Sequence, residues 1–207
     1  PLGASLAATA IAYALGEGVG RLACVSFGCC YGKPLSRLSP RLRRLFERHS
    51  FVIFGPTKKI AYEAGLEGEP VVPIQGITAG LFVAVALVGM ALFLLGHYRL
   101  ALGASFVATQ AWRSLSETLR ADYRGEAKRV SAYQVMALIG AMYLLALLPA
   151  LPDVDLPPAD ILAGLAVLWD PGVLLAMQGL WLAIFLRTGR SVVTGASLTF
   201  HVHREVV

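Results

Sequence analysis

The sequence predicts an all-α fold, a polytopic transmembrane helical bundle with a small extramembrane basic segment. Hydrophobic residues make up 57% of the chain and charged residues only 15%, well below the roughly 25% charged residues of soluble domains. Several apolar stretches are long enough to cross a hydrocarbon core of about 30 Å. The net charge of +5 indicates contact with anionic lipid headgroups rather than nucleic acid, because the basic residues adjoin apolar stretches.

The first predicted helix covers residues 3–24 and is rich in Ala, Gly and Leu. Glu17 and Arg21 lie four residues apart near its end, so their side chains can pair across one helical turn. The next segment, residues 33–73, holds several prolines and much of the charge, and it cannot span a bilayer. We expect its first part, residues 35–49, to form a basic amphipathic helix and the rest to form a small hairpin or an ordered cap.

Four further stretches complete the expected bundle. Residues 74–96 are almost uninterrupted in their apolar character and predict the clearest span. Residues 100–120 and 130–150 predict two more helices, separated by a charged loop. Residues 161–187 are apolar again, but Asp170-Pro171 interrupts them, which favours a short interfacial or re-entrant helix followed by a last span. We therefore expect about five spans or near-spans.

The chain is expected to divide near residue 150, where a cluster of Pro and Asp residues at 151–160 interrupts the helical pattern. Residues 1–150 form the predicted transmembrane core, and residues 151–207 form a C-terminal extension with a further helix or helices and a polar tail. His201 and His203 alternate on a β-prone run of that tail, a pattern that more often occurs without a metal than with one.

Three cysteines, Cys24, Cys29 and Cys30, are too few for a disulfide framework. The adjacent pair has α-carbons about 3.8 Å apart, too close for ordinary disulfide geometry. We expect Cys29 and Cys30 to be small packing residues, because no activating base is adjacent to them, with a nucleophilic Cys29 as the alternative. The sequence implies no metal or redox cofactor.

One helix face in the otherwise apolar stretch 100–120 is polar. Residues three and four apart project from the same side of a helix, so one stripe is formed by Gln110, Arg113, Glu117 and Arg120. A charge buried in a bilayer costs roughly 2.5 to 3.5 kcal/mol on insertion scales. The stripe therefore predicts a functional site that holds an anionic group, and the alternative is a structural ion-pair network that ties helices together.

The end of the first helix offers a second candidate for anion binding. A glycine-rich turn follows Arg21 and includes Gly28, Tyr31 and Gly32 near the expected membrane surface. Backbone amides freed by glycines and the fork of a guanidinium suit a phosphate group. We therefore expect the turn and the stripe to contribute to one phosphate site.

Four landmarks of the chain resemble the prolipoprotein diacylglyceryl transferase family. They occur in the family's order and cover roughly residues 1–150. Gly20-Arg21 with Gly28 and Gly32 resembles the family signature G-R-x-G-N-F-x-N-x-E-x-x-G, Pro73-Ile74-Gln75 resembles H-P-x-Q-L-Y-E, Arg113-x-x-x-Glu117-x-x-Arg120 resembles R-F-x-x-E-x-x-R, and Val130-Ser-Ala-Tyr-Gln134 resembles L-S-x-G-Q.

The resemblance implies a multi-pass protein of the bacterial inner membrane that moves the diacylglyceryl group of phosphatidylglycerol to a lipoprotein cysteine thiol and releases glycerol phosphate. It implies that Arg21, Arg113 and Arg120 grip the donor phosphate while Glu117 orients an arginine. The catalytic set would be Arg21, Arg113 and Glu117. The substrate-binding set would be Gly20, Gly28, Tyr31, Gly32, Gln75, Gln110, Arg120 and Gln134. The implied partners are a phosphatidylglycerol-like phospholipid, the membrane and a lipoprotein precursor.

The chain departs from the family pattern at several positions. Cys24 and Phe27 stand where the signature has asparagines, and Cys29 stands where it has glutamate. Ile77 and Thr78 replace the tyrosine and glutamate after the P-x-Q turn, and the family's upstream histidine motif has no counterpart in residues 1–207. These departures favour two alternatives, a divergent branch with another acceptor and a non-catalytic phospholipid-binding membrane subunit. Orientation also stays open, because the positive-inside rule places the basic loops in the cytoplasm whereas the resemblance places the signature toward the periplasm.

Overall fold

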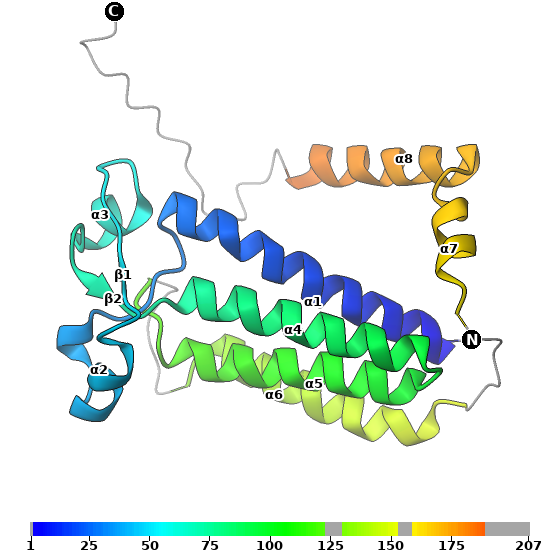
Figure 1. Ribbon diagram of the computed structural model, residues 1–207, viewed down its shortest axis with the longest axis horizontal. Coiled ribbons are helices and arrows are strands. Elements are labelled where there is room, and N and C mark those ends of the chain that lie inside the picture. Colours follow the sequence, from blue (N-terminus) through cyan, green and yellow to red (C-terminus); the bar gives the residue numbers. More distant parts are fainter. Residues whose placement is uncertain (1, 123–129, 153–158, 189–207) are drawn as a thin grey trace, which may run out of the picture. The chain divides into compact units, whose positions relative to one another are not determined.

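The computed structural model describes residues 2–122, 130–152 and 159–188 (Figure 1). The chain splits into two compact units, Pro1–Ala159 and Asp160–Val207, at the end of the Pro- and Asp-rich break. The first unit is a bundle of four long helices with a cap at one end of the bundle (Figure 1). The bundle helices are α1 (Leu2–Phe27), α4 (Ile74–Leu94), α5 (Tyr98–Glu117) and α6 (Ala132–Leu147).

Helix α5 lies at the centre of this bundle. It packs against α1, α4 and α6, and α1 also packs along α4. Within the part of the chain that the structure describes, three helices are long and apolar enough to cross a membrane, namely α1, α4 and α6 together with the 3₁₀ turn η2 (Leu148–Ala150) that extends it. Helix α5 has the length but not the apolar character, because polar and charged residues such as Gln110, Arg113 and Glu117 interrupt its apolar sequence. Each of the five predicted spans or near-spans is helical, and among the described residues three helices qualify as candidate spans by length and composition, or four if α7 and α8 count as one bent span.

Small side chains let the bundle helices approach closely. The core holds alanines of α1, α4 and α5 that are buried almost completely, and Leu144 of α6 packs with them. Small residues at a helix interface allow the two backbones to approach closely. In a membrane this van der Waals packing drives helix association, because lipid tails are as apolar as the side chains and the hydrophobic effect contributes little. Gly89 of α4 shows this most clearly, because a Cβ atom added there would lie 2.2 Å from Ser105 Oγ of α5 and 2.9 Å from Ile11 Cγ1 of α1.

We predict that Gly89→Ala destabilises the bundle by about 1 to 3 kcal/mol, the usual cost of overpacking a well-packed interface. The matched control is Gly80→Ala on the same helix, where an added Cβ atom would meet nothing within 4 Å. Thermal unfolding of both variants in detergent checks the prediction, with only Gly89→Ala expected to lower the midpoint. Equal midpoints for the two variants would show that the helices do not approach closely at Gly89.

The cap between α1 and α4 contains η1 (Leu35–Arg37), α2 (Pro40–Phe46), β1 (Phe51–Val52), α3 (Lys59–Ala64) and β2 (Pro70–Val71). The two strands pair antiparallel with Phe51 opposite Val71, which confirms the expected small hairpin or ordered cap. The expectation of one amphipathic helix over 35–49 was wrong, because Pro40 starts a new helix at its first turn and the chain before it forms a 3₁₀ turn.

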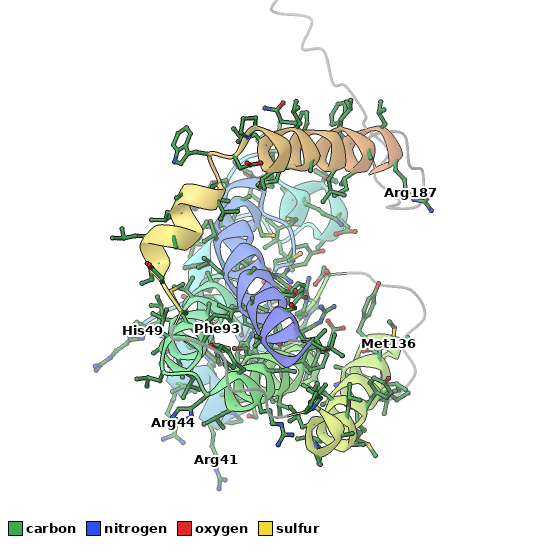
Figure 2. The ribbon with its side chains drawn as sticks, turned by 90° about the vertical axis from the view of Figure 1, so that its right-hand side faces the viewer. Arg41, Arg44, His49, Phe93, Met136 and Arg187 are labelled. Atoms are coloured by element: carbon green, nitrogen blue, oxygen red, sulfur yellow. The ribbon has the colours of Figure 1, made fainter. Side chains whose placement is uncertain are left out.

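The predicted amphipathic face of this region is also divided. Leu38 and Phe46 pack against the cluster of Leu35, Val72 and Ile74. The two leucines of α2 itself are exposed. The arginines of α2 are exposed as expected, and Arg41 and Arg44 point away from the bundle (Figure 2). The cap therefore presents a basic outer surface.

The second unit contains α7 (Ile161–Val167) and α8 (Pro171–Thr188), which meet at a bend of 69°. Asp160 caps α7 by accepting from the Leu162 and Ala163 amides, and Asp170 accepts from the Val173 amide at the start of α8. The predicted interruption at Asp170-Pro171 is confirmed. The β-prone tail with His201 and His203 lies outside the described residues.

Candidate functional site

Charged side chains of the bundle converge on one cavity of about 50 Å³. Its walls come from α1, α4, α5, the chain that follows α5 and the start of α6. The lining residues are Glu17, Arg21, Thr78, Phe82, Trp112, Arg113, Ser116, Glu117, Arg120 and Tyr133. Three guanidiniums thus face two carboxylates, and the lining carries a net positive charge. Four predicted site residues, Arg21, Arg113, Glu117 and Arg120, share this cavity.

Glu17 connects α1 to α5 at this cavity. Its carboxylate accepts hydrogen bonds from Arg21 Nη2 and Tyr13 Oη, one turn away on either side. On α5, Arg113 Nη1 lies 3.7 Å from Glu17 Oε2 and donates to Tyr13 Oη at 2.6 Å. The predicted pairing of Glu17 with Arg21 is confirmed. Arg113 extends this pair to a network that joins α1 and α5. Such a network is the alternative to an anion site that the sequence left open.

Arg120 reaches the cavity differently from the sequence expectation. Helix α5 ends at Glu117, so Arg120 does not lie on the helical stripe. It forms instead a β-bridge with Gly32, and the Lys33 amide donates to the Leu119 carbonyl at 2.8 Å. The turn after α1 therefore holds Arg120 in place from outside the helix.

The guanidinium of Arg120 makes a two-pronged contact with Asp122. Its Nε and Nη2 donate to the two carboxylate oxygens at 2.8 and 2.9 Å, with both side chains more than nine-tenths buried. Burial disfavours the charged guanidinium, but the hydrogen bonds and charge of Asp122 raise the pKa of Arg120 above its usual value. Arg120 is thus held as a fixed cation. The spacing Arg120-x-Asp122 in the charged loop was a signal that the sequence analysis missed.

The glycine-rich turn supports the site without lining the cavity. Gly28 ends α1 with φ of +63°, a conformation that favours glycine. Gly32 passes so close to β2 that an added Cβ atom would lie 2.3 Å from the Val72 carbonyl oxygen. Tyr31 is buried in the cap and donates from Oη to Glu63 at 3.0 Å, and Gly20 is exposed on α1. Burial first, then the Glu63 carboxylate, raises the pKa of Tyr31.

None of the three glutamines predicted to bind substrate lines the cavity. Gln75 is almost completely buried and donates from Nε2 to the Cys29 carbonyl at 2.9 Å. Gln134 forms a capping box with Ser131 at the start of α6 and donates to the Ser114 carbonyl of α5 at 3.1 Å. Gln110 is partly buried on α5 and is not part of the cavity lining. Gln75 and Gln134 thus hold the elements around the cavity together.

Polar and aromatic residues that were not predicted as site residues complete the walls of the cavity. Trp112 Nε1 donates to Thr78 Oγ1 at 2.9 Å, which ties α5 to α4 beside the cavity. Thr78 in turn donates to the Ile74 carbonyl one turn earlier. Ser131 Oγ donates to Glu117 at 3.4 Å, so the start of α6 contacts the carboxylate of the stripe. A threonine inside a strongly apolar span was the available sequence signal for this wall.

The arrangement suits an anionic group at the end of an apolar bundle. Guanidiniums present forked donors that match phosphate oxygens, and the cavity places three of them around one space. Partial burial makes such contacts stronger than they would be in water. No family model, curated protein or solved structure matches the chain.

Proposed function

We propose that the protein is a membrane-embedded transferase that moves a diacylglyceryl group from phosphatidylglycerol or a similar phospholipid to an acceptor. A lipoprotein cysteine thiol in a bacterial inner membrane is the acceptor that the sequence resemblance favours. The observation that carries the proposal is the convergence of Arg21 from α1 with Arg113 and Arg120 from the α5 region on one cavity. Apolar helices around that cavity offer a surface for the acyl chains.

Arg113 is the guanidinium best placed to receive a donor phosphate. Arg113 Nη1 lies 3.7 Å from Glu17 Oε2, which is longer than a hydrogen bond. The hydrogen bond from Nη1 to Tyr13 uses one of the five N–H donors of the guanidinium. Arg120 is fixed by Asp122 and Arg21 by Glu17, so both supply positive charge from set positions. A phosphate entering the cavity would meet one adaptable guanidinium and two held ones.

The proposed reaction uses this placement as follows. The acceptor thiol releases its proton to solvent, and its sulfur forms a bond to the glycerol carbon as the bond from that carbon to the phosphate oxygen breaks. The bonding electrons pass to the oxygen, and glycerol phosphate leaves with more negative charge than the bound diester carried. Cations fixed beforehand stabilise this developing charge without rearranging. Glu117, held through Ser131, balances the positive charge on the α6 side of the cavity.

We predict that purified protein incubated with radiolabelled phosphatidylglycerol and a lipobox peptide releases glycerol phosphate. Arg113→Ala is expected to lower the rate by roughly 100-fold or more, the usual effect of losing one stabilising donor. Arg41→Ala is the matched control, because Arg41 is an exposed arginine of the cap and not part of the lining. Release that is equal in the two variants would contradict the role of the cavity.

A second candidate is a non-catalytic membrane subunit that binds phospholipid. The pairs Arg21–Glu17 and Arg120–Asp122 favour it, because two of the three guanidiniums already have carboxylate partners. The same incubation separates the two candidates. Saturable binding of phosphatidylglycerol that requires Arg113, with no glycerol phosphate released, would support the subunit and exclude the transferase.

A further inference from the structure

A cluster of three thiols lies where α1 ends. The Sγ atoms of Cys24, Cys29 and Cys30 all lie within 4.8 Å of one another, and each side chain is partly buried. Cys29 and Cys30 were expected to be small packing residues, because no activating base is adjacent to them in the sequence. The fold brings all three thiols together, so the cluster calls for its own explanation.

The turn after α1 explains why the thiols meet. The Gly28 amide donates to the Val25 carbonyl at 3.3 Å and the Cys29 amide to the Cys24 carbonyl at 3.1 Å, which is the Schellman pattern of a helix end. In that pattern the residue after the left-handed glycine contacts the helix residue five positions earlier. Cys29 is thereby placed against Cys24. Cys30 then adopts φ of +53°, which side-chain-bearing residues rarely do, and its thiol joins the other two.

Neighbouring elements hold this turn firmly. Gln75 of α4 donates to the Cys29 carbonyl at 2.9 Å, and the Ile60 amide of α3 donates to the Gly28 carbonyl at 3.0 Å. Lys58 donates from Nζ to the Ser26 carbonyl at 2.6 Å. Three contacts from the cap and from α4 thus fix the backbone that carries the thiols. A ligand set held before the ligand arrives loses little conformational freedom on binding.

We propose that Cys24, Cys29 and Cys30 form a three-thiolate site for one soft d¹⁰ metal ion, with Cu(I) as its best occupant. Thiolates select soft ions such as Cu(I) and Zn(II). Metal–sulfur bonds of about 2.3 Å around a trigonal ion separate the sulfurs by roughly 4 Å, so small side-chain rotations suffice. Structural Zn(II) takes a fourth protein ligand, and the metal-ligand group found among the described residues stops at these three cysteines. Cu(I) is satisfied by three.

The surrounding charges fit a negatively charged metal–thiolate unit. Arg120 contacts the Cys30 thiol, and Arg21 lies within electrostatic reach of it. On binding, the metal displaces the thiol protons into solvent, and the nearby guanidiniums compensate the negative charge of the thiolates.

The test is an anaerobic titration of the purified, reduced full chain with Cu(I) in competition with a chromophoric Cu(I) chelator. We expect one Cu(I) bound per chain, with three sulfur neighbours at roughly 2.3 Å by X-ray absorption. Cys24→Ser, Cys29→Ser and Cys30→Ser should each weaken binding by at least 100-fold. Thermal unfolding of each variant without metal shows whether it is folded, and the absorption measurement on the unsubstituted chain stands whether or not the variants fold.

Three outcomes would overturn the assignment. The first is the absence of stoichiometric binding above the level of the triple serine variant. The second is a single serine variant that binds Cu(I) as tightly as the unsubstituted chain, which would mean that three thiols do not act together. The third is tighter binding of Zn(II) than of Cu(I) under the same conditions. The readout uses metal and thiols alone, so its result does not depend on the proposed transferase function.

Discussion

Glu17→Gln is expected to loosen the bundle and at the same time tighten its hold on anionic phospholipid. Glu17 accepts from Arg21 and Tyr13 and faces Arg113, and about four-fifths of its side chain is buried. Removing one partner of a buried ion pair leaves a charge that nothing compensates, at a cost of about 3 to 5 kcal/mol when burial is complete. For this partly exposed pair we expect a loss of about 2 kcal/mol, because solvent compensates part of it.

The effect on binding has the opposite sign. The substitution removes one of the two carboxylates that line the cavity and leaves all three guanidiniums in place. A phosphate then no longer competes with Glu17 for Arg113, and we expect phosphatidylglycerol to bind roughly threefold to tenfold more tightly, a gain of about 0.7 to 1.4 kcal/mol. Thermal unfolding and lipid titration on the same sample measure both quantities. Glu47→Ala on the exposed surface of the cap is the control and should change neither.

A destabilised Glu17→Gln variant with unchanged or weaker phospholipid binding would favour a purely structural network. The two interpretations separate because a structural ion pair has no reason to compete with an external anion. Reduced stability alone therefore does not decide between them.

Gly32→Ala is expected to have the largest structural effect of any single substitution in the cap. An added Cβ atom would lie 2.3 Å from the Val72 carbonyl oxygen and 2.7 Å from the Val72 Cβ atom, and backbone cannot move aside as a flexible side chain can. The chain around Gly32 is held on two sides, because Val72 donates its amide to the Lys33 carbonyl and Ala121 donates its amide to the Tyr31 carbonyl. We expect a loss of about 3 kcal/mol or more, at or above the usual range for overpacking.

The same substitution should also weaken phospholipid binding, because Arg120 pairs with Gly32 across the bridge and would be displaced from the cavity. The matched control is Gly20→Ala on α1, where an added Cβ atom would meet nothing within 4 Å. Thermal unfolding and phosphatidylglycerol titration measure the two effects. A Gly32→Ala variant as stable as Gly20→Ala would contradict the close passage of residues 32 and 72.

Local spacing predicted the parts of the site that lie on one helix. Glu17 and Arg21 pair because helical geometry places residues four apart on one face, whatever the surroundings. Arg113 and Glu117 share the cavity for the same reason. The interruption at Asp170-Pro171 was equally local, because proline cannot continue the preceding helix and aspartate caps the next one.

Tertiary contacts decided the parts that the sequence could not predict. Helical periodicity placed Arg120 on α5, but the bridge to Gly32, far away in the sequence, draws the chain out of the helix after Glu117. Pairing between distant segments leaves no local pattern. The thiol cluster lies between these cases. A glycine-rich turn was expected at the end of the first helix, whereas the left-handed conformation of Cys30 had no signal in the sequence.

We propose that guanidiniums from two separate helices hold one phosphate in this cavity. A double-mutant cycle on phosphatidylglycerol binding, with Arg21→Gln, Arg113→Gln and the double variant, measures this most directly. Residues that act on one ligand show coupling of about 0.5 to 3 kcal/mol, whereas independent sites add within about 0.5 kcal/mol. We expect coupling of about 1 kcal/mol between Arg21 and Arg113, and additivity when Arg41→Gln replaces Arg21→Gln. Additive losses for Arg21 and Arg113, or no loss for either, would show that the two arginines do not share a phosphate.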